Sequence, residues 1–373
     1  MKVLKINRKD LKHNINVIKN FLKKEEKDDD GRLPKIIGVV KGNGYGLGLI
    51  EFSQFLINNG ITILAVSSVE EALELREAGI DNEILLLGAT AIKADVEKLV
   101  DNNITITISS FDDLTVLNKI LENKNKKQKI SLKLDTGFNR YGFKIEELEE
   151  LIEKLKKSEN VEISGTFSHF SFAYAKENKY VKKQFDNFIN GIEKLKKAGI
   201  DTGMLHICNS CAFFKYPEMH LNAVRIGSAF LGRLPMKNIY GLKRIGNLCV
   251  PVSEIKTAIK GETVGYSNTV TMKKDTKIAI VQAGYIDGLN FGKFNDTFGN
   301  LDKIRILKNT ILDIFKDKHI YYYINDKKCM VVGKIGMNHV ALDITGKDIK
   351  IGDKVEISIS PLNVNSKIRR EYE

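Results

Sequence analysis

A lysine stands at the end of an apolar run and is followed by a glycine-rich stretch. The segment VVKGNGYGLG, residues 39–48, holds Lys41, Tyr45 and four glycines. A lysine that is removed from water near other cations has a lowered pKa, so its amine can act as a nucleophile or a base. Such amines form imines with carbonyl groups, including that of pyridoxal phosphate. By itself the stretch leaves open a plain surface lysine in a turn.

The secondary structure predicted around Lys41 helps to decide between a reactive lysine and a surface lysine. In the first 230 residues, eight short β-branched runs alternate with segments of helical periodicity such as VEEALELREAG (69–79) and IEELEELIEKLKK (145–157). This alternation favours parallel strands joined by helical crossovers and predicts a (β/α)8 TIM-type barrel over residues 1–240. A doubly wound sheet is the alternative. The predicted strands are 35–40, 63–68, 83–88, 104–109, 130–136, 163–170, 204–210 and 223–230.

Residues 241–373 show a different pattern of predicted secondary structure. Short strand-like runs such as VPVSEIKTAI and KCMVVGKIG follow one another, and most have no long helical period between them. We therefore expect a second, mainly β domain.

Polar residues gather at one predicted rim of the barrel. Barrel enzymes place their chemistry at the C-terminal ends of strands, and Lys41 follows the first strand. Scattered surface residues would not converge in this way, so the functional interpretation of Lys41 is favoured. The other residues on this rim are Arg140, His169, His206, Asn209, Ser210, Arg225, Gly227 and Ser228.

The same rim offers what pyridoxal phosphate would need. Ser210 and the RIGSA segment (225–229) follow the seventh and eighth strands, where barrels often bind phosphate. Arg225 is the candidate partner of the pyridine nitrogen. Because an arginine can only donate a hydrogen bond, it favours an unprotonated ring nitrogen. The resulting weaker electron sink suits proton removal and return at one carbon better than transamination.

Composition excludes several other classes of protein. The 373 residues carry a net charge of +12, but lysines are interspersed with glutamates, so we expect no nucleic-acid binding. No apolar run approaches ~20 residues, which predicts no membrane span and a cytoplasmic location. Cys208 and Cys211 form an isolated C-x-x-C pair that is better explained by buried thiols than by a metal site. The charged stretch KKEEKDDDG, residues 23–31, is expected to be an exposed loop.

Together these motifs resemble the pyridoxal-phosphate-dependent alanine racemases, of fold type III. VVKGNGYGLG is similar to the family's lysine signature. The other matching motifs occur in the family's order and cover nearly the whole chain. They are SSVEEALELREAGI, KLDTGFNRYGF, GTFSHFSFA, HICNSCAFF, VRIGSAFLG, VGYSNTV and AGYIDGL.

The resemblance implies a role for each matching residue. Lys41 would hold the cofactor and act as one base, and Tyr266 would be the second base. Arg140 would contact the cofactor and the substrate carboxylate, and Met337 would contact the substrate through its backbone. Lys133 matches a lysine that is carbamylated in some members, although neutralisation by Asp135 is an open alternative. The implied cofactor-binding residues are Lys41, Tyr45, Arg140, His169, Asn209, Ser210, Arg225, Gly227 and Ser228.

The resemblance further implies a homodimer with shared active sites that interconverts L- and D-alanine and supplies D-alanine for a bacterial wall. Two departures leave the substrate open: GMN stands at 336–338 where the family often has CMD, and Asn365 stands where many members have a tyrosine. Serine or a basic amino acid is an alternative substrate. A decarboxylase of the same architecture is a less favoured alternative, because it would place an acid rather than Arg225 at the ring nitrogen. A non-catalytic cofactor carrier and a binding protein without cofactor are further alternatives.

Overall fold

The computed structural model describes residues 1–23, 33–174, 179–289, 300–314 and 319–373, and the charged loop expected at 23–31 lies almost wholly outside this range. The chain forms two compact units. One comprises Arg8–Ile245, and the other comprises Met1–Asn7 with Gly246–Glu373. The first seven residues therefore belong with the β unit, whereas the sequence pattern assigns residues 1–240 to the barrel.

All eight predicted strands of the barrel are present, which confirms this part of the prediction. They form a parallel sheet in the order β4-β3-β2-β9-β8-β7-β6-β5, and an isolated parallel bridge between Leu85 and Thr105 links its two end strands. The strands are β2 (Lys35–Val39), β3 (Ile63–Val66), β4 (Glu83–Leu86), β5 (Ile106–Ile108), β6 (Gln128–Lys133), β7 (Val161–Phe167), β8 (Met204–His206) and β9 (Ala223–Ile226).

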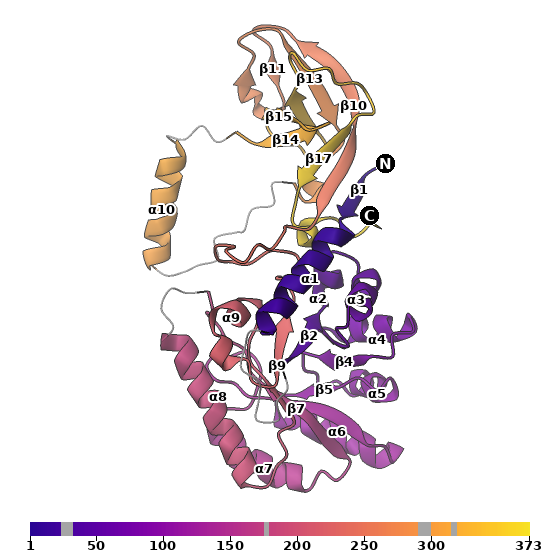
Figure 1. Ribbon diagram of the computed structural model, residues 1–373, viewed down its shortest axis with the longest axis vertical. Coiled ribbons are helices and arrows are strands. Elements are labelled where there is room, and N and C mark those ends of the chain that lie inside the picture. Colours follow the sequence, from indigo (N-terminus) through magenta and orange to yellow (C-terminus); the bar gives the residue numbers. More distant parts are fainter. Residues whose placement is uncertain (24–32, 175–178, 290–299, 315–318) are drawn as a thin grey trace. The chain divides into compact units, whose positions relative to one another are not determined.

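Helices lie between these strands in sequence and surround them in space (Figure 1). Helix α4 ends where expected, because Gly79 follows it with a φ of 76° that glycine adopts without strain. The barrel helices are α1 (Arg8–Leu22), α3 (Leu49–Asn58), α4 (Val69–Glu77), α5 (Lys93–Asp101), α6 (Phe111–Lys124), α7 (Leu148–Lys156), α8 (Lys179–Lys197) and α9 (Ser210–Lys215).

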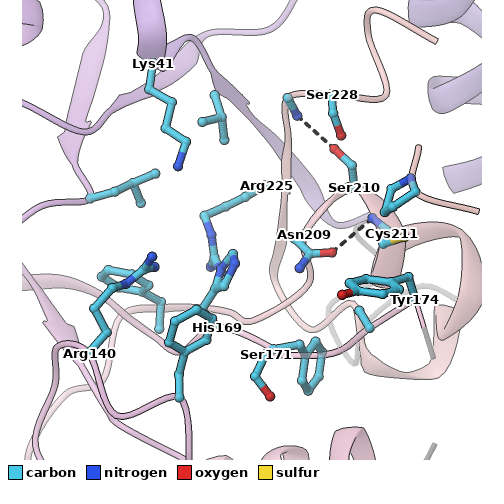
Figure 2. Close-up of a pocket in the computed structure, with 18 of the residues that line it drawn as sticks. Lys41, Arg140, His169, Ser171, Tyr174, Asn209, Ser210, Cys211, Arg225 and Ser228 are labelled. Atoms are coloured by element: carbon cyan, nitrogen blue, oxygen red, sulfur yellow. Dashed lines mark hydrogen bonds between the residues drawn. The ribbon is translucent and has the colours of Figure 1, made fainter. Parts of the chain in front are cut away.

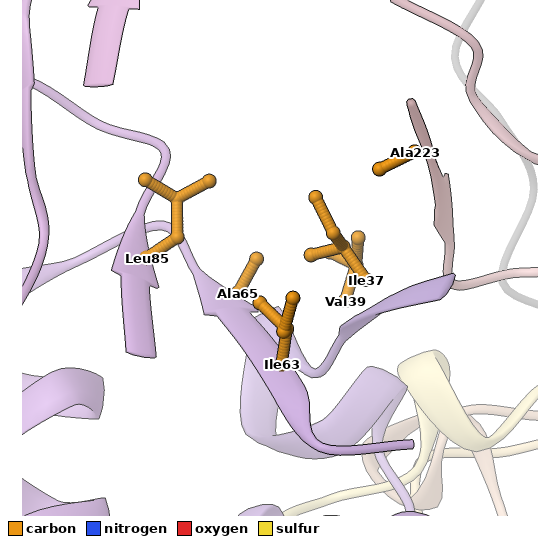
Figure 3. Packing of buried hydrophobic residues seen from close by; sticks show 6 residues of the cluster. All are labelled: Ile37, Val39, Ile63, Ala65, Leu85 and Ala223. Atoms are coloured by element: carbon orange, nitrogen blue, oxygen red, sulfur yellow. The ribbon is translucent and has the colours of Figure 1, made fainter. Parts of the chain in front are cut away.

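The interior of the barrel is packed with aliphatic side chains. Figure 3 shows a buried cluster to which β2, β3, β4 and β9 each contribute, with the side chains directed toward one another. Strands that are buried on both faces read as continuous apolar runs, which is why the sequence pattern located them. The cluster consists of Ile37, Val39, Ile63, Ala65, Leu85 and Ala223.

The second unit is a β structure, as predicted. Its strands β13-β16-β15-β14-β17-β10 form a closed ring because β10 also pairs with β13, and β1 and β18 extend the sheet from the first half of β10. Two short strands form a separate hairpin, β11 (Thr263–Val264) with β12 (Val270–Thr271). The strands of the main sheet are β1 (Val3–Ile6), β10 (Asn247–Ala258), β13 (Thr276–Val281), β14 (Tyr321–Ile324), β15 (Lys327–Val332), β16 (Val340–Asp343), β17 (Lys354–Ser358) and β18 (Arg369–Tyr372).

One helix in this unit was not expected. Helix α10 (Asn300–Ile314) lies between β13 and β14, and its residues Ile304 and Leu307 are exposed. No helix in the described part of the chain is long and apolar enough to cross a membrane.

Candidate active site

The barrel unit contains a cavity of about 380 Å³ at the C-terminal ends of its strands. All ten candidate residues that the resemblance placed in the barrel line it, and Figure 2 shows Lys41, Arg140, His169 and Arg225 around a common space. The lining includes the cations Lys41, Lys133, Arg140 and Arg225 but no carboxylate among the described residues. Such a cavity is suited to an anionic ligand.

Lys41 stands two residues after Val39, the last residue of β2, and is succeeded by a left-handed turn. Residues 42–45, which are Gly42, Asn43, Gly44 and Tyr45, have φ values of 65°, 54°, 63° and 54°. This conformation costs a non-glycine residue roughly 1–2 kcal/mol, so the alternating glycines limit the strain to Asn43 and Tyr45. The turn brings Tyr45 into the lining of the same cavity, beside Gly227.

Tyr45, Ser210 and Gly227 make a compact polar corner. The Ser210 hydroxyl accepts hydrogen bonds from Gly227 N at 3.0 Å and Ala229 N at 3.4 Å. A Cβ on Gly227 would lie 2.5 Å from the Tyr45 hydroxyl, so glycine is required there. Burial raises the pKa of Tyr45 to about 12, which keeps its hydroxyl a hydrogen-bond donor at neutral pH. A phosphate would find the hydroxyl donors of Tyr45 and Ser210 in this corner.

Asn209 has a structural task in this corner. Its side-chain oxygen accepts hydrogen bonds from Cys211 N at 3.0 Å and Ala212 N at 3.1 Å, and it thereby caps α9 (Figure 2). The cap fixes Ser210 as the first residue of the helix. Cys208 and Cys211 are buried free thiols, as expected.

Arg225 lies on β9 and is 3% exposed. Its guanidinium donates to the carbonyl oxygens of Ser168 at 2.6 Å, His206 at 3.0 Å and Ile207 at 3.1 Å. These bonds use the two terminal nitrogens, and Nε makes no hydrogen bond within the described chain. Burial lowers the pKa of Arg225 to about 10, so the group stays protonated at neutral pH.

Two histidines contact the same guanidinium. Nδ1 of His206 lies 2.6 Å from Arg225 Nη1, and Nδ1 of His169 lies 3.2 Å from Nη2. Because a guanidinium can only donate, both Nδ1 atoms accept and each ring carries its proton on Nε2. Burial, then Arg225, holds the pKa of both histidines well below the usual value, so both are neutral.

Arg140 is presented by a loop that folds back onto β6. Asp135 Oδ1 accepts hydrogen bonds from the amides of residues 137, 138 and 139 at 2.9 to 3.1 Å. Gly142 lies against the backbone of residues 133–135, where a Cβ would come within 2.7 Å of Asp135 N. The Arg140 guanidinium lies over the Phe138 ring at 4.3 Å, which restricts its direction.

Lys133 is 5% exposed and makes no ion pair with Asp135, whose Oδ1 is taken up by the three loop amides. The Asp135 charge still raises the pKa of Lys133, so neutralisation by Asp135 without modification stays an alternative to carbamylation. Burial and then Arg140 lower the pKa of Lys133 to about 8. For Lys41, burial and then Arg140 also lower the pKa, and Arg225 adds to this while Glu71 opposes it.

The two remaining candidates, Tyr266 and Met337, belong to the β unit and lie near each other there. The Tyr266 ring comes within 3.3 Å of a Cβ built on Gly336, the residue before Met337. Tyr285 joins this group through a hydrogen bond from its N–H to Gly336 O at 3.1 Å. Asn365 donates from Nδ2 to Ile286 O at 3.4 Å, which places it at the same loops. Tyr266, Tyr285 and Met337 are 73%, 55% and 49% exposed.

Sequence reasoning missed Phe138, which lies between Arg140 and His169 in the cavity wall, 5.6 Å from the histidine ring. An aromatic residue two positions before an arginine in a glycine-containing loop was the available signal. The cavity as a whole fits pyridoxal phosphate. It offers an amine at Lys41, donors beside a position where only glycine fits, and a buried arginine with an uncommitted Nε–H.

The fold and the cavity define a (β/α)8 barrel protein with a second, β domain and a cationic site suited to an anionic group. Family models describe the two parts as the N-terminal domain of alanine racemase, matched over residues 6–235, and its C-terminal domain, matched over 246–369. The chain belongs to the alanine racemase family, a family of isomerases.

Individual relatives agree with this assignment. The chain is 32% identical to alanine racemase of Methanococcus maripaludis over 92% of this chain and 87% of that protein. It is 33% identical to the enzyme of Clostridium tetani over 92% and 82%. The structure of Clostridium difficile alanine racemase matches with a TM-score of 0.80 at 30% identity, over 99% and 88% of the two chains. That of Bacillus anthracis with bound L-Ala-P matches with a TM-score of 0.78 at 26% identity, over 95% and 85%.

Proposed function

We propose that the protein interconverts L- and D-alanine with pyridoxal phosphate as cofactor. The observation that carries this proposal is the cavity that combines the Lys41 amine with three further cations and no carboxylate among its described lining residues. Membership of the alanine racemase family supports the same reaction. Cytoplasmic location and a supply of D-alanine to a cell wall are part of the proposal.

Different residues of the cavity would bind different parts of the cofactor. Lys41 would bond to its aldehyde carbon, while Tyr45, Ser210 and Ser228 would donate hydrogen bonds to its phosphate. Gly227, whose amide donates to Ser210 Oγ, would hold that hydroxyl toward the phosphate. When bound, the cofactor supplies an electron sink for the carbanion at the substrate Cα. Arg225 Nε–H would donate to the ring nitrogen, and this favours proton exchange over side reactions.

Two residues would move the proton. A planar carbanion has two faces, so inversion requires one base on each. Lys41, whose pKa is lowered by burial and by Arg140, would exchange a proton on the face of the D-isomer. Tyr266 would serve the face of the L-isomer. Arg140 would bind the substrate carboxylate, and the Met337 backbone would contact the substrate.

Lys133 is proposed to be carbamylated. Its buried amine has a pKa of about 8 and forms no ion pair within the described chain, although the Asp135 charge acts on it. Reaction with CO2 would form an N–C bond, release one proton and leave a negative charge near Arg140. That charge would restrain the guanidinium that binds substrate.

Chiral chromatography of reactions started from L- and D-alanine tests the main proposal. We expect both to reach the same racemic mixture, whereas L-serine, L-lysine and L-arginine should react more slowly. Faster serine turnover would favour the alternative opened by Asn365. Release of CO2 with accumulation of an amine would instead support the decarboxylase alternative.

Two variants then separate the bases. Borohydride reduction should fix the cofactor to Lys41, and Lys41→Ala should lose this attachment. Tyr266→Phe should abolish racemisation but still exchange the α-hydrogen of D-alanine with solvent deuterium, as measured by NMR. Exchange of L-alanine by Tyr266→Phe at the wild-type rate would contradict the role of Tyr266.

A further inference from the structure

Two strand-to-helix turns of the barrel repeat the pattern Ser-Ser-x-x-acid. They are residues 67–71, which end at Glu71, and residues 109–113, which end at Asp113. In each, the second serine caps the following helix: Ser68 Oγ accepts from Glu71 N at 3.3 Å, and Ser110 Oγ accepts from Asp113 N at 3.2 Å. Both acids also accept a hydrogen bond from the first serine's amide, at 3.1 Å and 2.8 Å. This is a local helix-capping arrangement.

The two turns differ in what the second carboxylate oxygen does. Glu71 Oε1 reaches the neighbouring turn and accepts from Gly42 N at 2.6 Å and Asn43 N at 3.2 Å. The side-chain hydrogen bonds of Asp113 within the described chain stay in its own turn. Glutamate is one methylene longer than aspartate, and the extra length provides this reach.

The amides that Glu71 binds are the first two after Lys41. They belong to the left-handed turn at residues 42–45, and neither donates to a backbone carbonyl within the described chain. By contrast, Gly44 N donates to Val40 O at 2.8 Å. Amide groups need acceptors, so Glu71 supplies the part of the hydrogen bonding that this turn cannot supply itself.

We propose that Glu71 is a positioning residue for Lys41, because its carboxylate ties the turn after Lys41 to the β3–α4 turn and so fixes where the amine enters the cavity. This inference rests on the proposed role of Lys41. Glu71 is also the anion among the charged groups acting on Lys41, where it opposes Arg140 and Arg225. The other titratable groups coupled to Lys41 are Lys133 and His169.

Four variants, two at Glu71 and two controls, separate reach, charge and capping. Glu71→Asp keeps the charge and the local cap but, like Asp113, should not reach Gly42. Glu71→Gln keeps the length and removes the charge. Glu70→Gln removes the adjacent exposed carboxylate and serves as the charge control, and Asp113→Asn weakens the equivalent cap of α6 and serves as the capping control.

The first readout uses cofactor-free protein: the pH dependence with which an amine-acylating reagent labels Lys41, followed by mass spectrometry. Glu71→Gln should shift the labelling midpoint to lower pH, and Glu70→Gln should not. The second readout is kcat in cofactor-saturated protein. Glu71→Asp should lower kcat at least about tenfold, because a shift of about 1 Å in a reacting group can cost ~10²-fold. Its melting temperature should change no more than that of Asp113→Asn.

A Glu71→Asp protein with wild-type kcat and labelling would overturn the inference. If Glu71→Asp does not fold, Glu71→Gln decides instead, and wild-type behaviour there has the same meaning. The parallel Lys41→Ala experiment keeps the two ideas apart. If Lys41→Ala retains the covalent cofactor, the proposed function of Lys41 fails. If it loses the cofactor while both Glu71 variants behave as wild type, only the role of Glu71 fails.

Discussion

At the scale of single residues, the cavity brings several positively charged side chains close together. Burial makes it energetically costly to keep such groups protonated. Lys133 shows this most clearly, since it is enclosed beside Arg140 without an ion-pair partner in the described chain. Its pKa of about 8 in the fold lies below that of a free lysine, so between about pH 8 and 10.5 the unfolded chain binds more protons than the fold. Stability contributed through this group therefore rises with pH across that window.

Lys133→Met should remove this dependence. In CO2-free buffer at pH 7, we expect the free energy of unfolding of the cofactor-free variant to exceed that of wild type by about 1–3 kcal/mol. This difference should become smaller as the pH approaches 10. Bicarbonate should stabilise wild type by forming the carbamate, but not Lys133→Met. Lys129→Met, an exposed lysine on the same strand, is the control. Equal responses of Lys133→Met and wild type to both pH and bicarbonate would contradict this account.

At the scale of elements, the ends of the barrel strands form the site, and their tight turns tolerate little added volume. Gly227 has no left-handed φ, so an alanine there meets only the steric obstacle of Tyr45. Gly227→Ala should displace the Tyr45 ring and weaken cofactor binding by at least about tenfold, which is the loss of roughly one good hydrogen bond. Titration of cofactor by absorbance measures this.

A double variant isolates the cause. Gly227→Ala should lower the melting temperature less when it is added to Tyr45→Ala than when it is made in the wild type, because the colliding ring is gone. The double variant should not recover cofactor affinity. If Gly227→Ala binds cofactor as tightly as wild type, the corner formed by Tyr45, Ser210 and Gly227 is not the phosphate site.

Much of this element-level picture was predictable from the sequence, because each barrel strand is a local apolar run bounded by a helical period. Strand β1 was not predictable in this way, since Val3–Ile6 alternates with lysine and pairs with residues 247–249 and 369–372. The reach of Glu71 to Gly42 was also hidden. Its capping pattern is visible in the sequence, but the same pattern at Asp113 makes no such contact.

At the scale of the whole molecule, the two candidate bases lie in different units. Lys41 follows a barrel strand, whereas Tyr266 belongs to the β unit together with Met337. The resemblance named both residues, and no local pattern could say which copies of the chain supply them. The side chains of Tyr266, Tyr285 and Met337 are exposed in the single chain.

A dimer that shares its sites makes a quantitative prediction for mixed subunits. Lys41→Ala and Tyr266→Phe homodimers should each be inactive, because every site lacks one base. After subunit exchange at equal concentrations, half of the dimers should be hybrids. In each hybrid, one site combines the intact Lys41 with the intact Tyr266, while the other carries both changes. Activity should therefore recover to about a quarter of the wild-type value per subunit, as expected for a symmetric dimer. Differently tagged subunits, purified through both tags, verify the exchange. If each site were built within one chain, the hybrid would hold no complete site, and a verified hybrid without activity would establish that arrangement.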